Sequence, residues 1–345
     1  MSMETIDLIS ALERAAAGEE VSVETAINAH WPSVGRDGDK KAEQSRRRLI
    51  NYADDEDIRS RDLEYARSFR EEMRWRADEL KGLGAVSGDT PVPADQPSAT
   101  RPPRVWKFWG TTLWGVLAFA AMSLGQLTVV AFEVMRSGEP IDLGLIVKAV
   151  SSGTTVALSV IMGLPAVCLA LWLAIRIARN SFTDYLGLRG TSWKNALLGT
   201  VALVVLVGAW EVLAKLTGHK SAPGFMLDVV KSAQDDGTLW LLVIALTAGA
   251  AITEEILARG FLYRGWSESF LRPIGAMVLS SLVWTAMHAQ YYDPFLFTQV
   301  FTMGLLFGYL RYRSASTWLT IYLHALNNLA ATVQTLLIMK GVISP

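Results

Sequence analysis

Hydrophobic and polar positions divide the chain into two parts with different patterns. Up to about residue 84, apolar residues recur at three- and four-residue intervals among many charges, as in the run Leu63, Ala66, Phe69, Met73 and Ala77. Such spacing predicts amphipathic helices that pack one face inward. From Trp106 onward, long apolar runs dominate. The pattern predicts a soluble, mostly helical domain over residues 1–84 and a membrane domain over residues 106–345.

The second part contains apolar stretches that are long enough, or nearly so, to cross a bilayer as helices, which takes about 20 residues. There are seven, at residues 108–135, 145–175, 193–216, 239–264, 273–290, 295–311 and 317–339. Residues 85–105, rich in Pro, Ser and Ala, predict a linker. The expected fold class is therefore all-α: a polytopic transmembrane helix bundle of about seven spans with a small helical soluble N-terminal domain.

Positive residues in the connections predict the orientation of these spans. They precede the first span and recur in every second connection, at Arg101, Arg104, Lys107, Arg176, Arg179, Arg189, Lys194, Arg264, Arg272, Arg311 and Arg313. The connections between them are neutral or acidic on balance. Since cytoplasmic loops carry the excess of Lys and Arg, we expect a cell-membrane protein with a cytoplasmic N-terminal domain and a C-terminus outside.

Composition excludes several classes of function. The chain of 345 residues is 51% apolar and 19% charged, and more than half of its charged residues precede Arg104. A net charge of -1 gives no field for nucleic acid. The single cysteine, Cys168, excludes an internal disulfide framework and a thiolate cluster, and we expect it to pack as a small hydrophobe. We expect no cleavable signal peptide, since residues 1–25 are acidic and lack an apolar core.

Two adjacent glutamates and an arginine interrupt the fourth apolar stretch, where ionised side chains are costly. Glu255 and Arg259 are four residues apart with the acid first, the favourable order for an intrahelical ion pair. Glu254 points about 100° away on an ideal helix, without a local partner. We expect the ion pair to be structural and Glu254 to be available for chemistry. Glu133 and Glu211 lie near predicted outer helix ends, where water is reachable, and receive no role.

Further polar residues lie at depths that let them meet Glu254. His288 and His324 occur in apolar runs, and Asn328 shares a helical face with His324, while Asn327 should point elsewhere. Glu254 and His288 each lie roughly 20–30 Å along their helices from the turn between them, at 1.5 Å per residue. Any one of these residues alone more often forms a structural hydrogen bond between helices. Together with a carboxylate they favour a site.

Three motifs follow one another along successive predicted helices. EExxxR is Glu254 to Arg259, an aromatic-xxx-His element is Trp284 to His288, and HxxxN is His324 to Asn328. In this order they resemble the motifs of the CPBP family of intramembrane proteases, which includes Rce-type CAAX prenyl endopeptidases and bacteriocin-immunity proteins. The segment DYLGLRG at residues 184–190 is similar to one that often precedes the family's core. The resemblance covers about residues 182–339, with Trp284 where the family usually has Phe.

The resemblance implies hydrolysis of a peptide bond within or beside the membrane. Glu254 would deprotonate a water that His288 orients or shares, since a carboxyl group in a low-dielectric pocket can serve as a general base. His324 and Asn328 would donate hydrogen bonds to the developing oxyanion. Glu255 and Arg259 would brace the helix or hold the end of the substrate.

A zinc mechanism is the other chemistry that these residues allow. Glu254, His288 and His324 could hold a zinc ion with water in the fourth position, as His₂Glu sites do. The chain lacks the HExxH helix that would favour zinc. We therefore expect water activation by Glu254 without a tightly bound metal.

Two other classes of function compete with an endopeptidase. One is a non-catalytic membrane protein of the immunity or scaffold type on the same fold; the other is a proton-coupled transporter, since intramembrane acids and histidines also build proton relays. No pair of broken helices repeats in the two halves, which disfavours transport. The expected partners are a peptide or protein substrate at the membrane, with or without a lipid attached, and the bilayer, but no nucleic acid.

Overall fold

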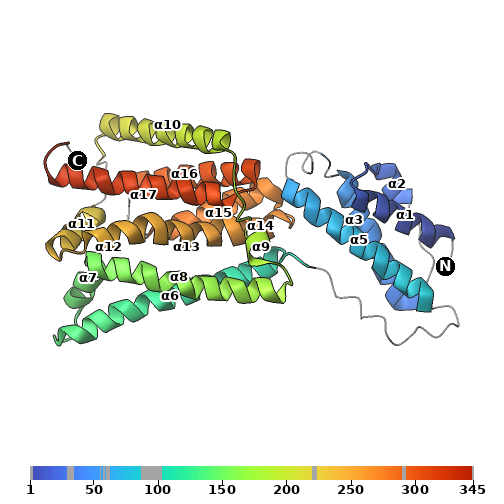
Figure 1. The fold of residues 1–345 in the computed structure, drawn as a ribbon, viewed down its shortest axis with the longest axis horizontal. Helices are drawn as coiled ribbons and strands as arrows, with labels where there is room; N and C mark the ends of the chain where they lie inside the picture. The colour runs from blue at the N-terminus through green and yellow to red at the C-terminus, as the bar shows by residue number, and fades with distance from the viewer. Residues whose placement is uncertain are drawn as a thin grey trace. The chain divides into compact units, whose positions relative to one another are not determined.

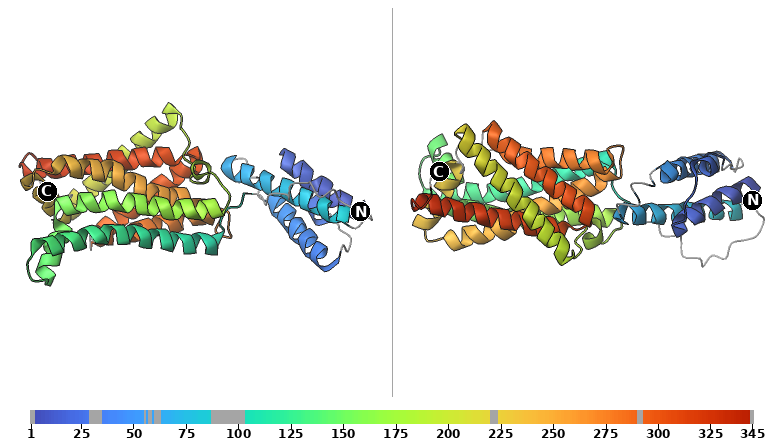
Figure 2. Two further views of the ribbon diagram at one scale, coloured as in Figure 1. Left: turned by 60° about the horizontal axis from the view of Figure 1, so that its bottom comes forward. Right: turned by 90° about the horizontal axis from the view of Figure 1, so that it is seen from above.

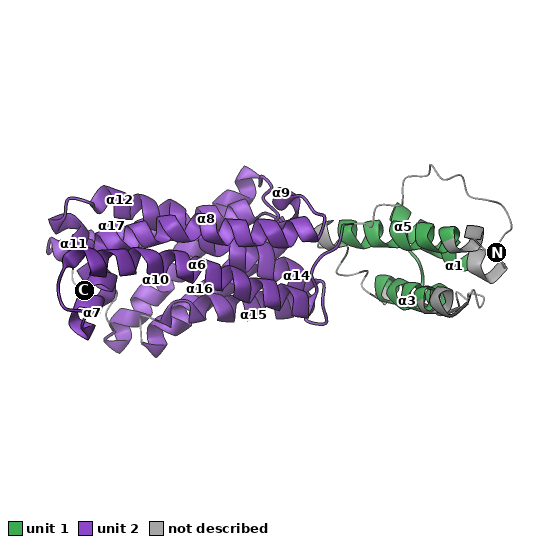
Figure 3. Ribbon diagram, turned by 90° about the horizontal axis from the view of Figure 1, so that it is seen from below, with its two compact units in different colours: residues 1–103 green, residues 104–345 purple. Residues whose placement is uncertain are grey.

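The computed structural model describes residues 3–28, 35–54, 56, 59, 63–86, 103–219, 224–289 and 293–343, and all regular secondary structure among them is helical. The chain divides into two compact units, residues 1–103 and 104–345 (Figure 3). Of the predicted linker 85–105, residues 87–102 lie outside the described residues. The soluble character of the first unit stays a prediction.

The first unit is built from amphipathic helices. They are α1 (Met3–Ala17), α2 (Val23–Asn28), α3 (Gly35–Asp54) and α5 (Leu63–Val86). The predicted apolar face of α5 is buried at Ala66, Phe69, Met73 and Ala77, which are at most 5% exposed. The ring of Phe69 lies 5.5 Å from that of Tyr52 on α3. The three- and four-residue spacing therefore predicts this helix and its inward face correctly.

The second unit is a bundle of long helices with shorter ones at its ends (Figure 1). Its elements are α6 (Phe108–Ser137), α7 (Leu143–Ser151), α8 (Gly153–Ile177), α9 (Phe182–Tyr185), α10 (Trp193–Thr217), α11 (Gly224–Asp235), α12 (Leu239–Ile244), η1 (Ala245–Ala250), α13 (Ala251–Glu255), η2 (Ile256–Leu262), α14 (Tyr263–Ser267), α15 (Arg272–Ala286), α16 (Pro294–Ser314) and α17 (Thr317–Met339). The elements α12 to α14 follow one another without a break, and we call Leu239–Ser267 the central helix.

Among the described residues, four helices are long and apolar enough to cross a membrane: Phe108–Ser137, Gly153–Ile177, Trp193–Thr217 and the central helix. Helices occupy each of the seven predicted stretches, the fifth of them over Arg272–Ala286, but the expected count of seven spans stays a prediction. The predicted stretch 145–175 is in fact two helices. Ser152 ends α7 and caps α8, where its hydroxyl accepts a hydrogen bond from the Thr155 N–H. The junction reads Ser-Ser-Gly-Thr-Thr over residues 151–155, small residues that only briefly interrupt the apolar run on either side.

Large apolar side chains cover the outside of the second unit. Leu113, Leu124 and Phe132 on α6 are 60%, 66% and 61% exposed, and Leu198 and Val205 on α10 are similarly open. Continuous apolar surface of this kind marks an interaction with lipid or protein. Together with the candidate spans, it supports a membrane protein.

The central helix lies between α8 on one side and α17 on the other (Figure 1). The left view of Figure 2 shows that α6 and α8 run side by side, so that α6, α8, the central helix and α17 form successive neighbours. Helices α7 and α11 lie at the end of the bundle where α17 finishes, and α9 and α14 lie at the opposite end (Figure 1). The central helix is thus covered over much of its length.

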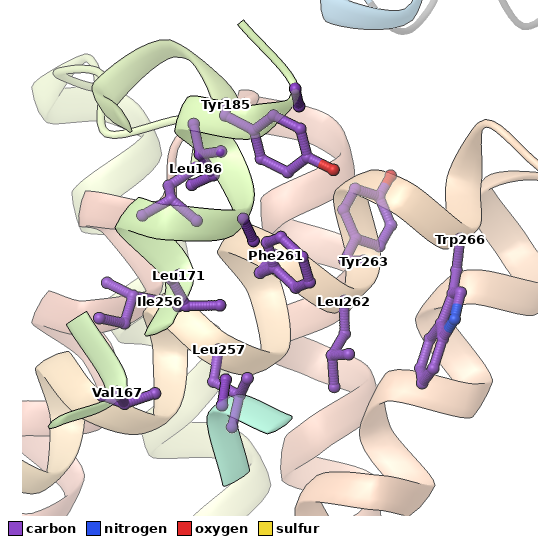
Figure 4. Packing of buried hydrophobic residues seen from close by; sticks show 14 of the residues in the cluster. Val167, Leu171, Tyr185, Leu186, Ile256, Leu257, Phe261, Leu262, Tyr263 and Trp266 are labelled. Atoms are coloured by element: carbon purple, nitrogen blue, oxygen red, sulfur yellow. The ribbon is translucent and has the colours of Figure 1, made fainter. Parts of the chain in front are cut away.

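Dense packing fixes the segment that directly follows the two glutamates. Ile256, Leu257 and Phe261 of η2 are at most 3% exposed and belong to one buried cluster with side chains of α8 and α9 (Figure 4). The ring of Phe261 stacks on Tyr185 with 5.5 Å between centroids. Burial raises the pKa of the Tyr185 phenol, which accepts the N–H of Trp106. Since lipid offers little hydrophobic drive for association, such packing holds the helix in place.

Candidate active site

The two adjacent glutamates lie on α13, a short α-helical segment between the π-helical segments η1 and η2. A π segment adds a residue to a helical turn, and such insertions occur frequently at functional sites. The sequence predicts a regular helix here, because apolar periodicity does not reveal a single added residue. The π-helical turns change the directions in which the side chains of Glu254 and Glu255 point. The residues that contact these two side chains can therefore be identified only from the structure.

Glu254 faces the other predicted site residues. Its Oε2 atom accepts a 2.7 Å hydrogen bond from Trp284 Nε1. The Nε2 atoms of His288 and His324 lie 3.8 Å and 4.0 Å from the same oxygen. The side chain of Glu254 is 19% exposed, and it lines a cavity. The expectation for Glu254 concerns a partner on its own helix, and the partner that the structure gives it comes from another helix, the indole of Trp284 on α15.

Glu255 is fully buried and points to a different set of groups. Its Oε1 atom lies 2.9 Å from Arg259 Nη1 in the ion pair that the four-residue spacing predicts. The same oxygen lies 3.0 Å from His324 Nδ1. His324 therefore lies between the two glutamates, with one ring nitrogen toward each. Glu255 does more than neutralise Arg259: it also orients a histidine of the site.

Arg259 ties this pair to α15 and α16. Its Nη2 donates a 3.1 Å hydrogen bond to the carbonyl of Gly304, and its Cζ lies 4.5 Å from the centre of the Trp284 ring. A Cβ atom on Gly304 would come within 3.0 Å of Ser281 and 3.3 Å of Arg259 Nη2. Only glycine lets the backbone of α16 approach this closely without displacing a neighbour.

His288 is oriented by its own helix turn. Its Nδ1 lies 2.9 Å from the carbonyl oxygen of Trp284. Because a carbonyl only accepts, Nδ1 carries the hydrogen, and the neutral ring then presents a lone pair at Nε2 toward Glu254. The ring also meets Trp284 edge to face at 4.8 Å between centroids. Trp284 thus positions both His288 and Glu254.

Asn328 lies on α17 one turn beyond His324 and lines the same cavity. Its Nδ2 donates a 2.9 Å hydrogen bond to the carbonyl of Leu246 in η1. One N–H of the amide therefore serves the π-helical segment and one remains for a ligand. Asn327, which the helical spacing directs elsewhere, lines the cavity too, because the cavity wraps around more of α17 than one face.

The cavity beside Glu254 has a volume of about 740 Å³. Polar side chains from several helices line it, including Gln126 of α6, Ser159 of α8, Glu211 of α10 and Gln299 of α16. Its size falls within the range of ligand pockets, roughly 300–1,000 Å³. The arrangement can therefore hold a short peptide segment together with water next to a carboxylate and two histidines.

The zinc alternative does not fit the donors as they stand. Among the described residues, no group of three or more His, Cys, Asp or Glu side chains is arranged to hold a metal ion. The indole N–H of Trp284 takes one acceptor position of Glu254 Oε2, the atom nearest both imidazoles. We therefore derive no step through a metal.

Two groups at this site were not identified from the sequence. The motif identifies Trp284 only as an aromatic ring, although Trp in place of Phe supplies one extra hydrogen-bond donor at that position. Gly304 gave no signal, since a glycine in a long apolar helix is common. The contact between His324 and Glu255 joins α17 to the central helix across 69 positions, and helical spacing cannot predict it.

The fold and this group of side chains define a helical protein with a carboxylate–histidine site facing a cavity. Residues 236–330 match the family described as type II CAAX prenyl endopeptidase Rce1-like. All three motifs lie within this segment, so the resemblance to the CPBP family of intramembrane proteases is confirmed over residues 236–330. No curated protein matches the chain, and no solved structure matches it.

Proposed function

We propose that the chain is an intramembrane endopeptidase that hydrolyses a peptide bond of a membrane-associated protein or peptide, with Glu254 as the general base. The observation that carries the proposal is the convergence of two imidazole Nε2 atoms on one oxygen of Glu254, at 3.8 Å and 4.0 Å, at the edge of a cavity. The match to a protease family at residues 236–330 supports the reaction class.

Glu254 takes a proton from water, and the resulting hydroxide attacks the carbonyl carbon of the substrate. The neutral His288, with its hydrogen on Nδ1, accepts a hydrogen bond from this water at Nε2 and fixes its position. When the tetrahedral intermediate breaks down, Glu254 returns the proton to the leaving amine nitrogen. The carboxylate ends the cycle ionised, as general acid–base catalysis requires.

His324 can donate to the oxyanion only if it carries two hydrogens. Its Nδ1 hydrogen points to Glu255 Oε1 at 3.0 Å, so a neutral ring would present a lone pair at Nε2. The carboxylates of Glu254 and Glu255 and the guanidinium of Arg259 together leave the side chains around His324 with one negative charge in excess. The proposal therefore takes His324 as an imidazolium that lies 3.0 Å from the carboxylate of Glu255. We assign the imidazolium of His324 and the remaining N–H of Asn328 as the oxyanion donors.

Glu255 and Arg259 act as positioning groups in this proposal. Their ion pair is completely buried, and it links the central helix to α16 through Gly304 and to α17 through His324. Neither side chain lines the cavity. The proposed setting is the cell membrane, with the N-terminal unit in the cytoplasm and the C-terminus outside.

The experiment that tests this function compares new protein N-termini in membranes of cells that express either the native chain or Glu254→Ala at matched levels. The proposal predicts a set of N-termini that appears only with the native chain and so identifies the substrate. Identical sets from two folded proteins would overturn the proposal and favour a non-catalytic binding protein of the immunity or scaffold type.

A further inference from the structure

The cavity beside Glu254 extends well beyond the proposed catalytic group. It continues along α17 past Asn328 to Gln334 and is bounded there by Glu211 of α10. Among the described residues that line it, Glu211 and Glu254 carry the only carboxylates, and neither Lys nor Arg occurs. Apart from the proposed catalytic group of Glu254, His288 and His324, Glu211 is thus the only ionisable side chain among these lining residues, and its charge favours a ligand of the opposite sign.

Glu211 is held toward the cavity by α17. Its Oε1 accepts a 2.9 Å hydrogen bond from Gln334 Nε2, and both side chains are half-buried. An ionised carboxylate has about four acceptor positions, so a single amide donor leaves most of them for a ligand. Lys215, one turn further along α10, is exposed and does not line the cavity. Glu211 therefore presents its charge to whatever enters.

The distance between Glu211 and the proposed catalytic group follows from α17. Gln334, which contacts Glu211, lies ten residues after His324 on this helix, and that spacing corresponds to about 15 Å along the helix axis. An extended peptide covers roughly 3.3–3.6 Å per residue. A substrate that reaches Glu211 from the scissile bond therefore spans about four to five residues.

We propose that Glu211, held by Gln334, is a specificity-determining subsite that binds a Lys or Arg side chain of the substrate, about four to five residues from the scissile bond. The inference rests on the proposed endopeptidase function and adds a substrate class to it. Both residues lie outside the segment 236–330 that matches the protease family, so the subsite is separate from the three motifs.

A series of internally quenched peptides tests the subsite. The peptides are apolar dodecapeptides of constant sequence in which a single Lys is placed at each position in turn. Two matched sets carry norleucine or Glu at the position of the Lys. The purified full chain in lipid nanodiscs should cleave peptides with Lys four to five residues from the cleaved bond with a kcat/KM about tenfold above the norleucine set, the range of one charge-assisted hydrogen bond. Glu211→Gln should abolish this preference, and Glu211→Lys should transfer it to the Glu set.

The choice of variants separates a subsite from a merely structural contact. Glu211→Gln keeps a side chain that can hydrogen-bond Gln334 and removes only the charge, so a structural role predicts no change in positional preference. Glu133→Gln is the matched control, because Glu133 pairs with Arg136 on α6 and does not line the cavity. It should retain the full Lys preference. A Lys preference that survives in Glu211→Gln, or that never occurs at this spacing, overturns the subsite.

A binding measurement distinguishes failure of the subsite from failure of the protease. Fluorescence anisotropy of the labelled Lys and norleucine peptides is recorded on Glu254→Gln and on the double variant Glu254→Gln/Glu211→Gln. Tighter binding of the Lys peptide to Glu254→Gln, lost in the double variant, supports the subsite. This holds even if the native chain cleaves no peptide. Absence of cleavage by the native chain would overturn the proposed function and not the subsite. Equal binding of the two peptides by Glu254→Gln overturns the subsite.

Discussion

The Nδ1 atom of His324 lies 3.0 Å from Oε1 of Glu255, at the centre of the bundle. This contact connects the buried ion pair to the side chains around the cavity, since the other ring nitrogen of His324 faces Glu254. A change in the ion pair should therefore reach the proposed chemistry through the orientation of one imidazole.

Trp284→Phe should lower kcat by about tenfold or more while leaving KM almost unchanged. The change keeps an aromatic ring but removes the N–H that donates to Glu254 at 2.7 Å, and hydrogen bonds to charged groups contribute roughly 1.5–3 kcal/mol. Steady-state kinetics on a cleaved peptide measure the effect. Trp266→Phe is the matched control, because its indole binds Thr112 away from the cavity. Equal rates for the native chain and Trp284→Phe would refute the role of the indole.

Arg259→Met should strongly destabilise the protein, because it removes the guanidinium that pairs with the fully buried Glu255. Breaking a buried pair from one side costs about 3–5 kcal/mol, whereas replacing both partners is far less costly. The double variant Glu255→Gln/Arg259→Met should therefore regain part of the loss. Thermal unfolding in detergent compares the three proteins. A double variant no more stable than Arg259→Met would show that the pair is not what the single change disrupts.

Asn328→Ala should destabilise the central helix as well as slow hydrolysis. The amide donates to the carbonyl of Leu246 in η1, and a buried acceptor that loses its partner costs about 1–3 kcal/mol. Hydrogen exchange of residues 245–250 should report faster opening in this variant. Asn327→Ala supplies the comparison from the neighbouring position. If the two variants open equally, the contact with η1 does not stabilise the π-helical segment.

Treatment with a zinc chelator should leave peptide cleavage unchanged in rate. The proposed chemistry uses Glu254 and water, and the donors around Glu254 Oε2 are not arranged to hold a metal. The measurement is the initial rate of the purified chain before and after chelation and dialysis. A loss of activity that added zinc restores would replace this mechanism with a metal-dependent one.

The sequence predicts the helices well because apolar periodicity and length reflect local chemistry. Residues 239–264 read correctly as one long helix, and the four-residue spacing of Glu255 and Arg259 correctly predicts their ion pair. The break at Ser152 and the π-helical segments escape prediction, since a short run of small polar residues or one added residue hardly changes the mean hydropathy of a long apolar stretch. Both features nevertheless decide which side chains face the cavity.

The candidate site is only partly readable from sequence for a related reason. Depth along the helices lets Glu254, His288 and His324 meet. In the structure, the Nε2 atoms of both histidines lie within 4.0 Å of Oε2 of Glu254. The contact of Trp284 with Glu254 and that of His324 with Glu255 depend on how helices rotate against one another. Rotation is set by packing of the whole bundle, which residue spacing along a single helix does not encode.

The central claim is that Glu254 performs chemistry while Glu255 maintains the structure, and a paired measurement on Glu254→Gln and Glu255→Gln tests it most directly. Cleavage rate and thermal stability are recorded for both variants and the native chain. We expect Glu254→Gln to fold with near-native stability and to lose all cleavage. Glu255→Gln should lose stability and retain a measurable rate. Equal tolerance of both substitutions would contradict this division of roles.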